Sequence, residues 1–277
     1  MGKLYVVGTP IGNLGDFSPR AAETLAAVDF IAAEDTRVTV KLLNHFGIKK
    51  PMVIYQKFNE REQGEAIVAR LCAGENCAIV TDAGMPCISD PGETLVRLCV
   101  TAGIPVEAVP GPSALVTALA VSGLSVSRFT FEGFLSVKHS SRMEHLRSLI
   151  REHRTMIFYE APHKLLSTLR DMYAVLGDKN VVLVRELTKI HESAWRGTLS
   201  EAVAYHEANP PKGEYVLILE GMPEEETSDP LGDAVALARK LADEENMPLS
   251  AAAREAAKLS GCAKGEIYQA LLAEREE

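Results

Sequence analysis

The sequence has few of the features that mark membrane, secreted or disulfide-rich proteins. No apolar run approaches the length of a membrane span, because the most apolar segment, residues 114–124, is short and contains Thr117, Ser122 and Gly123. The first residues lead directly into a predicted strand, so we expect no signal peptide. The five cysteines form no CxxC pair. Four of them lie in or beside apolar segments, so we expect buried, reduced thiols in a cytosolic protein: Cys72, Cys77, Cys87 and Cys99.

An excess of positive charge is also absent. The formal net charge is −9, which by itself argues against a nucleic-acid-binding protein. Residues 224–277 hold 13 acidic and 6 basic side chains, a net of −7, which leaves only −2 for residues 1–223. Within that body, residues 138–154 contain five Lys or Arg against two Glu, a local balance of +3. This basic segment could meet phosphates, or it could be the solvated face of a helix.

A stiff loop with the sequence TDAGMPCISDPG, residues 81–92, follows one predicted strand and precedes a predicted helix. Pro86 and Pro91 restrict its backbone, whereas Gly84 can adopt angles closed to other residues. Asp82 and Asp90 can accept hydrogen bonds from nearby amides. Open α/β sheets bind ligands at the carboxyl ends of their strands, so we predict a functional loop rather than a merely well-capped connection.

Strands and helices alternate along the first half of the chain, which is typical of a mostly parallel sheet covered on both faces. The first loop, GTPIGNLGD, does not match the GxGxxG fingerprint, so a nicotinamide-binding Rossmann site is poorly supported. The second half predicts another α/β domain, with a ligand cleft between the two. We predict an α/β fold with domains at residues 1–114 and 115–222, then an acidic linker and a helical tail at residues 223–277.

The tail predicts a helix, a short turn at Gly261 and a second helix, which is the helix-turn-helix pattern. Residues 247–273 carry three bases against two acids, so charge does not require nucleic-acid binding. A hairpin that serves packing or dimerisation is at least as consistent with this composition.

Seven motifs follow one another in a fixed order: GTPIGNLGD, AEDTR, DAGMPCISDPG, VPGPSA, FEGF, FYEAPH and RELTKIHE. Together they resemble the tetrapyrrole methylase superfamily of S-adenosylmethionine enzymes. Within it they are most similar to the subfamily that methylates a cytidine ribose 2′-hydroxyl in 16S ribosomal RNA. The resemblance covers residues 4–220, and the helical tail fits the same subfamily. It implies a homodimer that acts on the decoding region of the 30S subunit and takes S-adenosylmethionine as methyl donor.

The resemblance also implies where the cofactor binds. Its contacts would come from the first loop, from the stiff loop at residues 81–92 (the central loop), from one helix N-terminus and from the lining of the second domain. The implied residues are Pro10, Ile11, Asp82, Gly84, Met85, Ile88, Ser113, Ala114, Phe134, Tyr159 and Ala161.

A ribose hydroxyl is a weak acid, so its methylation needs a base or a cation that stabilises the developing alkoxide. We hypothesise that Lys189, held by Glu186 or Glu192, orients or deprotonates this hydroxyl. Glu160 and Arg196 also lie at predicted strand ends and complete the catalytic candidates. The alternative is a structural network of ion pairs.

Phosphate contacts are predicted for exposed basic side chains: Arg37 and Arg196 at strand ends, and Lys138, Arg142 and Arg147 on the basic segment. No metal site is predicted, because His163 and His191 lie in separate loops. Two rival functions stay open. One is a small-molecule methylase that acts on a tetrapyrrole or corrinoid, and the other is a regulator whose helix-turn-helix reads DNA.

Overall fold

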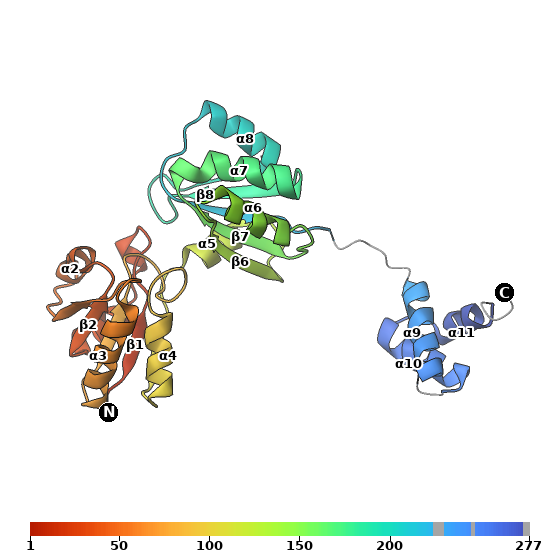
Figure 1. Cartoon of the computed structure of the whole chain (residues 1–277), viewed down its shortest axis with the longest axis horizontal. Coiled ribbons are helices and arrows are strands. Elements are labelled where there is room, and N and C mark those ends of the chain that lie inside the picture. The colour runs from red at the N-terminus through yellow and green to blue at the C-terminus, as the bar shows by residue number, and fades with distance from the viewer. Residues whose placement is uncertain (224–229, 245–246, 274–277) are drawn as a thin grey trace. The chain divides into compact units, whose positions relative to one another are not determined.

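The computed structural model describes residues 1–223, 230–244 and 247–273. The chain divides into two compact units, Met1–Met222 and Pro223–Glu277, and each is treated separately below (Figure 1). Most of the predicted acidic linker, residues 224–229, lies outside the described residues.

The first sheet of the larger unit is fully parallel. Its strand order is β3-β2-β4-β1-β5, and every pairing between neighbours runs in the same direction. The strands are β1 (Leu4–Val7), β2 (Phe30–Ala33), β3 (Met52–Ile54), β4 (Cys77–Val80) and β5 (Val106–Val109). All residues of β2 and β4 are buried, as expected for central strands covered on both faces.

Four helices cover the two faces of this sheet. Helices α1 and α2 pack against the face that carries Ile31 and Val80, and α3 and α4 pack against the face that carries Phe30 and Ile79. The helices are α1 (Pro19–Ala27), α2 (Thr36–His45), α3 (Glu60–Cys72) and α4 (Glu93–Thr101), and a 3-10 turn, η1 (Leu14–Asp16), precedes them. The predicted α/β architecture is therefore confirmed for this half.

The second sheet is mixed, with the order β6-β7-β10-β8-β9. Only β6 and β7 run parallel, while β10 is antiparallel to both β7 and β8, and β8 is antiparallel to β9. The start of β10 consequently lies beside the ends of β7 and β8. The strands are β6 (Phe129–Phe134), β7 (Thr155–Glu160), β8 (Asn180–Arg185), β9 (Ser193–Thr198) and β10 (Tyr215–Leu219).

Helices also cover both faces of the second sheet (Figure 1). Helix α5 packs on one face, against alternate residues such as Val184 and Val216. Three helices pack on the other face, against Leu183 and Leu217. The helices are α5 (Ala114–Ser122), α6 (His139–Ser148), α7 (Pro162–Leu176) and α8 (Leu199–Ala208).

Two elements of this half differ from the sequence prediction. The basic segment, expected as one helix over residues 138–154, is helical only over α6. Residues 149–151 form a turn and residues 152–154 are irregular, because Leu149 leaves helical angles and Glu152 pairs locally with Arg154. Helix α8 was not predicted at all. It begins with a capping box in which the Thr198 and Glu201 side chains each accept a hydrogen bond from the other residue's backbone amide.

The smaller unit contains three helices within residues 230–244 and 247–273. They are α9 (Pro230–Glu244), α10 (Leu249–Ser260) and α11 (Lys264–Ala273). Their shared core is built largely from alanines such as Ala238, Ala252 and Ala256, whose small side chains let the helices approach closely. Gly261 ends α10 with φ of 76°, a left-handed angle that favours glycine. The predicted helix-turn-helix is confirmed.

The cysteine prediction is wrong at one position. Cys77 and Cys99 are buried and Cys87 is partly buried, but Cys72 is exposed because it lies on the outer face of α3, beside the buried Leu71. None of the helices in the described part of the chain is both long and apolar enough to cross a bilayer.

Candidate functional site

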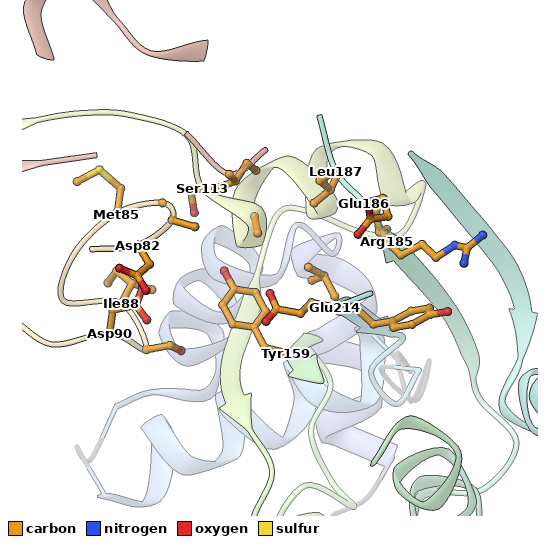
Figure 2. A pocket seen from close by; sticks show the side chains of 18 of the residues that line it. Asp82, Met85, Ile88, Asp90, Ser113, Tyr159, Arg185, Glu186, Leu187 and Glu214 are labelled. Carbon is orange, nitrogen blue, oxygen red and sulfur yellow. The ribbon is translucent and has the colours of Figure 1, made fainter. Parts of the chain in front are cut away.

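A cavity of about 300 Å³ opens in the larger unit, where the carboxyl ends of the first sheet meet loops of the second (Figure 2). Its walls come from the first loop, the ends of β2 and β4, the central loop, the start of α5 and the ends of β6, β7 and β8. The start of β10 and the loop after β8 complete the lining. Both α/β halves therefore contribute to one site, as the sequence predicted for the cleft.

The first and central loops are tied together by backbone contacts. Thr9 and Gly84 exchange two hydrogen bonds, Thr9 N to Gly84 O at 2.9 Å and Gly84 N to Thr9 O at 3.1 Å, and the Thr9 hydroxyl donates to Thr81 O. Gly8 approaches the loop before α5 so closely that a Cβ on it would lie 2.7 Å from the Gly111 Cα. Only glycines fit this junction, which brings the first loop against the segment before α5.

Strained backbone is concentrated beside the cavity. Within the described residues, the non-glycine positions with positive φ are Cys87 (74°), Ser89 (69°), Glu186 (52°) and Thr188 (67°). The first two lie in the central loop and the other two in the loop after β8, so both loops border the cavity. Such conformations persist only where the surroundings enforce them, and they are concentrated at functional sites.

The ends of β2 and β4 are joined by a pair of hydrogen bonds. Asp82 N donates to Glu34 Oε2 at 3.3 Å, and Asp35 N donates to Asp82 Oδ1 at 3.2 Å. Asp35 itself caps α2 by accepting from Arg37 N, and its carboxylate binds the Arg37 guanidinium at 2.6 Å. This contact holds the pKa of Asp35 at about 2, well below its ordinary value.

The N-terminus of α5 faces the second half of the lining. The Leu115 amide donates to the Tyr159 hydroxyl at 3.0 Å, which fixes the Tyr159 ring in the cavity wall. Phe131 and Phe134 pack edge-on against that ring, with centroids 4.9 and 5.5 Å away. In Figure 2, the Tyr159 ring and the Glu214 carboxylate lie side by side in the cavity wall.

The loop after β8 carries a basic side chain of the lining, Lys189. Lys189 Nζ lies 3.1 Å from Glu186 Oε1. A Cβ at Gly213 would meet Glu186 Oε1 at 2.6 Å, so the Glu186 carboxylate rests against bare backbone. Thr188 N donates to Glu192 Oε2 at 2.6 Å, which closes the loop. The arrangement presents one amine, held by one carboxylate, at the edge of the cavity.

Acidic groups outnumber basic groups in the described lining. Five carboxylates face two basic side chains: Glu34, Asp82, Asp90, Glu186 and Glu214 against Arg185 and Lys189. Burial, reinforced by the neighbouring carboxylates, raises the pKa of Asp90 to about 6. Burial also raises the pKa of Glu34 and of Asp82. The cavity is electronegative and suits a ligand that carries positive charge.

Most of the predicted cofactor residues come together here. Those that line the cavity are Ile11, Asp82, Gly84, Met85, Ile88, Ser113, Ala114, Phe134 and Tyr159. Pro10, which precedes Ile11, and Ala161, two residues after Tyr159, are not part of the lining. Of the catalytic candidates, Lys189 and Glu186 line the cavity.

Three catalytic candidates have other roles in the structure. Glu160 is 1% exposed, and its carboxylate binds Lys164 Nζ at 2.7 Å and the Thr168 hydroxyl at 2.6 Å, which makes it part of a buried ion pair. The Arg196 guanidinium binds the Ser122 and Val121 carbonyls at the end of α5. The Glu192 carboxylate accepts a hydrogen bond from the Thr188 amide, so it stabilises the loop and does not line the cavity.

The predicted RNA contacts also need a correction. Arg142 is 7% exposed and binds Asp171 Oδ2 at 2.6 Å, so it packs α6 against α7 instead of facing solvent. His145 likewise pairs with Glu132 at 2.9 Å. Of the five Lys and Arg side chains of the basic segment, Arg142 thus pairs with a neighbouring helix. Lys138 and Arg147 are exposed, and Arg37 is exposed while bound to Asp35.

Several lining residues were not among the predicted site residues: Glu34, Ala83, Ser89, Asp90, Val184, Arg185, Leu187, Glu214, Tyr215 and Val216. Glu34 and Asp90 lie inside two of the seven sequence motifs, AEDTR and DAGMPCISDPG. Their acidic side chains were the signal that could have identified them as site residues. Glu214 and Tyr215 precede or begin a strand. They reach the site only because β10 is antiparallel, which no local pattern reveals.

A metal ion would need a group of ligands, and in residues 1–223, 230–244 and 247–273 no three His, Cys, Asp or Glu side chains are grouped in that way.

Comparisons with protein-family models match two parts of the chain. Residues 3–203 match the model of the tetrapyrrole (corrin/porphyrin) methylases, and residues 229–275 match the RsmI C-terminal HTH domain.

Curated relatives extend the similarity to full length. A Haemophilus influenzae protein is 46% identical over 100% of this chain and 98% of its own. A Synechocystis protein is 54% identical over 80% of each chain, and a Thermotoga maritima protein is 50% identical over 80% of this chain and 99% of its own. All three are named ribosomal RNA small subunit methyltransferase I.

Solved structures share the fold at low sequence identity. The methyltransferase CobJ has a TM-score of 0.59 and 16% identity, and it covers 80% of this chain and 95% of its own. Uroporphyrin-III C-methyltransferase from Thermus thermophilus, solved with S-adenosyl homocysteine, has a TM-score of 0.55 and 19% identity over 79% and 97% of the two chains.

Proposed function

This chain belongs to the tetrapyrrole methylase family, and from that premise we propose that it transfers a methyl group from S-adenosylmethionine to small-subunit ribosomal RNA. The relatives that match it over most of their length carry that substrate in their name, ribosomal RNA small subunit methyltransferase I. The C-terminal match to the RsmI HTH domain supports the same choice over a small-molecule methylase.

The electronegative cavity is the observation that carries the cofactor assignment. S-adenosylmethionine has a sulfonium and an ammonium against one carboxylate, so five acidic groups facing two basic ones favour it. When bound, it supplies an activated methyl group for in-line displacement. A relative in fold, uroporphyrin-III C-methyltransferase, has been solved with the demethylated product, S-adenosyl homocysteine.

The residues present fit such a ligand. Met85, Ile88 and Tyr159 provide apolar surface for an adenosine, while the N-terminus of α5, where the Ser113 side chain makes no capping hydrogen bond, suits a carboxylate. We propose that Asp82 and Asp90 favour the positive groups of the cofactor.

We propose that Lys189 acts on the nucleophile. Its amine lies at the cavity edge, and Glu186 holds it there at 3.1 Å. The amine would orient the ribose hydroxyl and stabilise the charge that develops on its oxygen, while the methyl group moves from sulfur to that oxygen and the hydroxyl proton passes to water. Glu186 would position Lys189, and Glu192 would keep their loop closed through the Thr188 amide. Pro10 and Ala161 would support the cofactor indirectly, through the nearby lining residues Ile11 and Tyr159.

The finer assignments rest on the sequence motifs. We propose that the acceptor is the 2′-hydroxyl of a cytidine in the decoding region of 16S RNA. The substrate would be the assembled 30S particle in the cytoplasm, and the enzyme would be a homodimer. Lys138, Arg147 and Arg37 are exposed basic side chains that could meet RNA phosphates.

The experiment that tests this function is methyl transfer from labelled S-adenosylmethionine to 30S subunits that lack the modification, followed by mapping of the labelled nucleoside. Label in 2′-O-methylcytidine is the expected result. Label in another nucleoside would overturn the acceptor assignment. Absence of label in RNA, with the cofactor still bound, would overturn the RNA substrate and favour a tetrapyrrole or corrinoid acceptor.

A further inference from the structure

A second cavity, of about 260 Å³, lies on the opposite face of the second sheet, beneath α8. Four of its lining residues carry aromatic rings: Trp195 on β9, Tyr205 and His206 on α8, and Tyr215 at the start of β10. We call this space the aromatic chamber. Its remaining lining residues are Leu183, Arg185, Ser193, Ala194, Asn209 and Pro210.

His206, one of the lining residues of the chamber, has an unsatisfied acceptor. The residue is 5% exposed, and its Nδ1 lies 3.1 Å from the Asn209 carbonyl oxygen. A carbonyl can only accept, so Nδ1 carries the hydrogen. Burial lowers the pKa of the imidazole, which keeps the ring neutral and leaves a lone pair on Nε2. That atom is buried without a partner in the described part of the chain, an arrangement that is costly unless something donates to it.

Arg185 brings donors to the same space. Alternation along β8 turns Val184 toward α5 and the first cavity, and turns Leu183 and Arg185 toward α8. In Figure 2 the Arg185 side chain extends away from the first cavity. Its Nε donates to Ser193 Oγ at 2.9 Å, which steadies the guanidinium in the chamber wall.

The rings offer flat apolar surface. Trp195 and Tyr205 have centroids 5.8 Å apart, with 33° between their planes, and Tyr205 lies edge-on to His206 at 5.0 Å. Tyr205 is 43% exposed, so the chamber can be reached from solvent. Flat rings, one guanidinium and one unused acceptor together match the recognition chemistry of a nucleobase, which stacks and presents both donors and acceptors at its edge.

The chamber and the first cavity share part of their lining. Arg185 and Tyr215 line both spaces, and they are register partners on β8 and β10. The chain continues from Arg185 directly into the loop that presents Lys189 to the first cavity. Single-stranded RNA that passes the end of β8 and the start of β10 could therefore contact both the chamber and the first cavity.

We propose that the aromatic chamber binds a nucleobase of the RNA substrate, adjacent in the RNA to the nucleotide whose ribose is held at Lys189. This inference rests on the proposed function. His206 Nε2 accepts from an N–H group of the base, Arg185 donates to its carbonyl or ring nitrogen, and Trp195 and Tyr205 supply the stacking surface. The chamber thereby selects which ribose along the RNA reaches the methyl donor.

The first test uses intrinsic fluorescence. Trp195 is the only tryptophan of the chain, so its emission reports on the chamber alone. The full chain would be titrated with cytidine 5′-monophosphate, with a short single-stranded RNA and, as a control without a base, with ribose 5-phosphate. Saturable quenching by the first two probes and none by the third is expected. Equal responses to all three would overturn the proposal.

The second test uses kinetics on 30S subunits. Tyr205→Leu removes a stacking ring at an exposed position, and Tyr173→Leu removes a similarly exposed ring on α7, outside both cavities. Tyr205→Leu should raise KM for 30S about tenfold, with kcat and S-adenosylmethionine affinity unchanged, as expected for one lost stacking contact. Tyr173→Leu should match the wild type.

The outcomes separate this inference from the proposed function. If the wild type does not methylate RNA, the proposed function fails and the chamber has no RNA to bind. If the wild type methylates 30S and Tyr205→Leu has a normal KM, only the chamber assignment fails. Quenching by a peptide rich in aromatic side chains, without quenching by RNA, would assign the chamber to a protein partner and overturn the nucleobase.

Discussion

Gly12 of the first loop lies against Lys189 of the loop after β8, so closely that a Cβ on Gly12 would come 2.7 Å from Lys189 Cγ and 2.9 Å from Lys189 Cε. Gly12 also has φ of 154°, an angle that side-chain-bearing residues rarely adopt. The first α/β half thus sets the position of the amine that the second half presents. Two motifs that are far apart in sequence are coupled at the edge of the cavity.

Gly12→Ala should therefore displace Lys189. We expect kcat to fall by about tenfold or more, since small displacements of a positioned group are costly, while the affinity for S-adenosylmethionine changes less. Turnover on 30S subunits and equilibrium cofactor binding measure the two effects. The control is Gly47→Ala, another position with positive φ but with no atom within 4 Å of the added Cβ. Equal losses in both variants would mean that backbone strain, not contact with Lys189, is responsible.

Lys189→Ala should lower kcat by roughly 100-fold or more, the range usual for loss of a group that assists proton transfer. Cofactor affinity should stay near that of the wild type, because the acidic lining remains. Lys49→Ala, at an exposed lysine outside the cavity, is the matched control. Wild-type turnover in Lys189→Ala would remove the role assigned to this amine.

Asp90 should make both stability and cofactor binding depend on pH. Its pKa in the folded protein, about 6, is raised above the ordinary value of 3.8, so the buried carboxylate destabilises the fold above pH 6 and has no such effect below about pH 4. Asp90→Asn should raise the free energy of unfolding at pH 8 by on the order of 1 kcal/mol after solvent screening, and leave it unchanged near pH 4. Denaturant titrations at the two pH values measure this difference.

The same carboxylate should favour a cationic ligand only when it is charged. We expect the affinity of the wild type for S-adenosylmethionine to increase as pH rises through 6, and this increase to be reduced in Asp90→Asn. Calorimetric titrations from pH 5 to 8 follow the effect. A pH profile identical in both proteins would contradict the proposal that Asp90 favours the cofactor.

Lys164→Ala should destabilise the second sheet rather than impair catalysis directly. The change leaves the Glu160 carboxylate, which is 1% exposed, without its charged partner at 2.7 Å. Removing one member of a buried pair costs about 3–5 kcal/mol, and Tm should fall by roughly 6–20 °C for a unit of this size. Calorimetry gives Tm. Turnover per folded molecule at low temperature should be retained, and its loss would restore Glu160 to the catalytic candidates.

Arg142 and Arg147 should respond differently to charge reversal. Arg147→Glu changes an exposed side chain, so RNA affinity should fall and its salt dependence should become shallower, with Tm unchanged. Arg142→Glu places a carboxylate beside Asp171 in a buried contact, so Tm should fall strongly. Thermal melts and RNA binding at several salt concentrations compare the two. An unchanged RNA affinity in Arg147→Glu would exclude α6 from the RNA interface.

Local sequence patterns determined most of the elements. Runs of buried residues such as those of β2 and β4, the Ser18–Pro19 start of α1 and the Gly261 turn each act over a few residues, so they can be read directly. Glycines and prolines in the first and central loops also marked the cavity, because only particular residues tolerate the close approaches and angles found there.

The tertiary structure decided which charges act and which are neutralised. Sequence alone could not distinguish Lys189, at the cavity edge, from Arg142, whose charge is matched by Asp171 on another helix. Burial and pairing depend on partners that are far away in the chain. The antiparallel direction of β10 likewise placed Glu214 and Tyr215 at the site and created the wall shared with the aromatic chamber. Strand direction is set by how whole elements pack, so only the folded chain could show it.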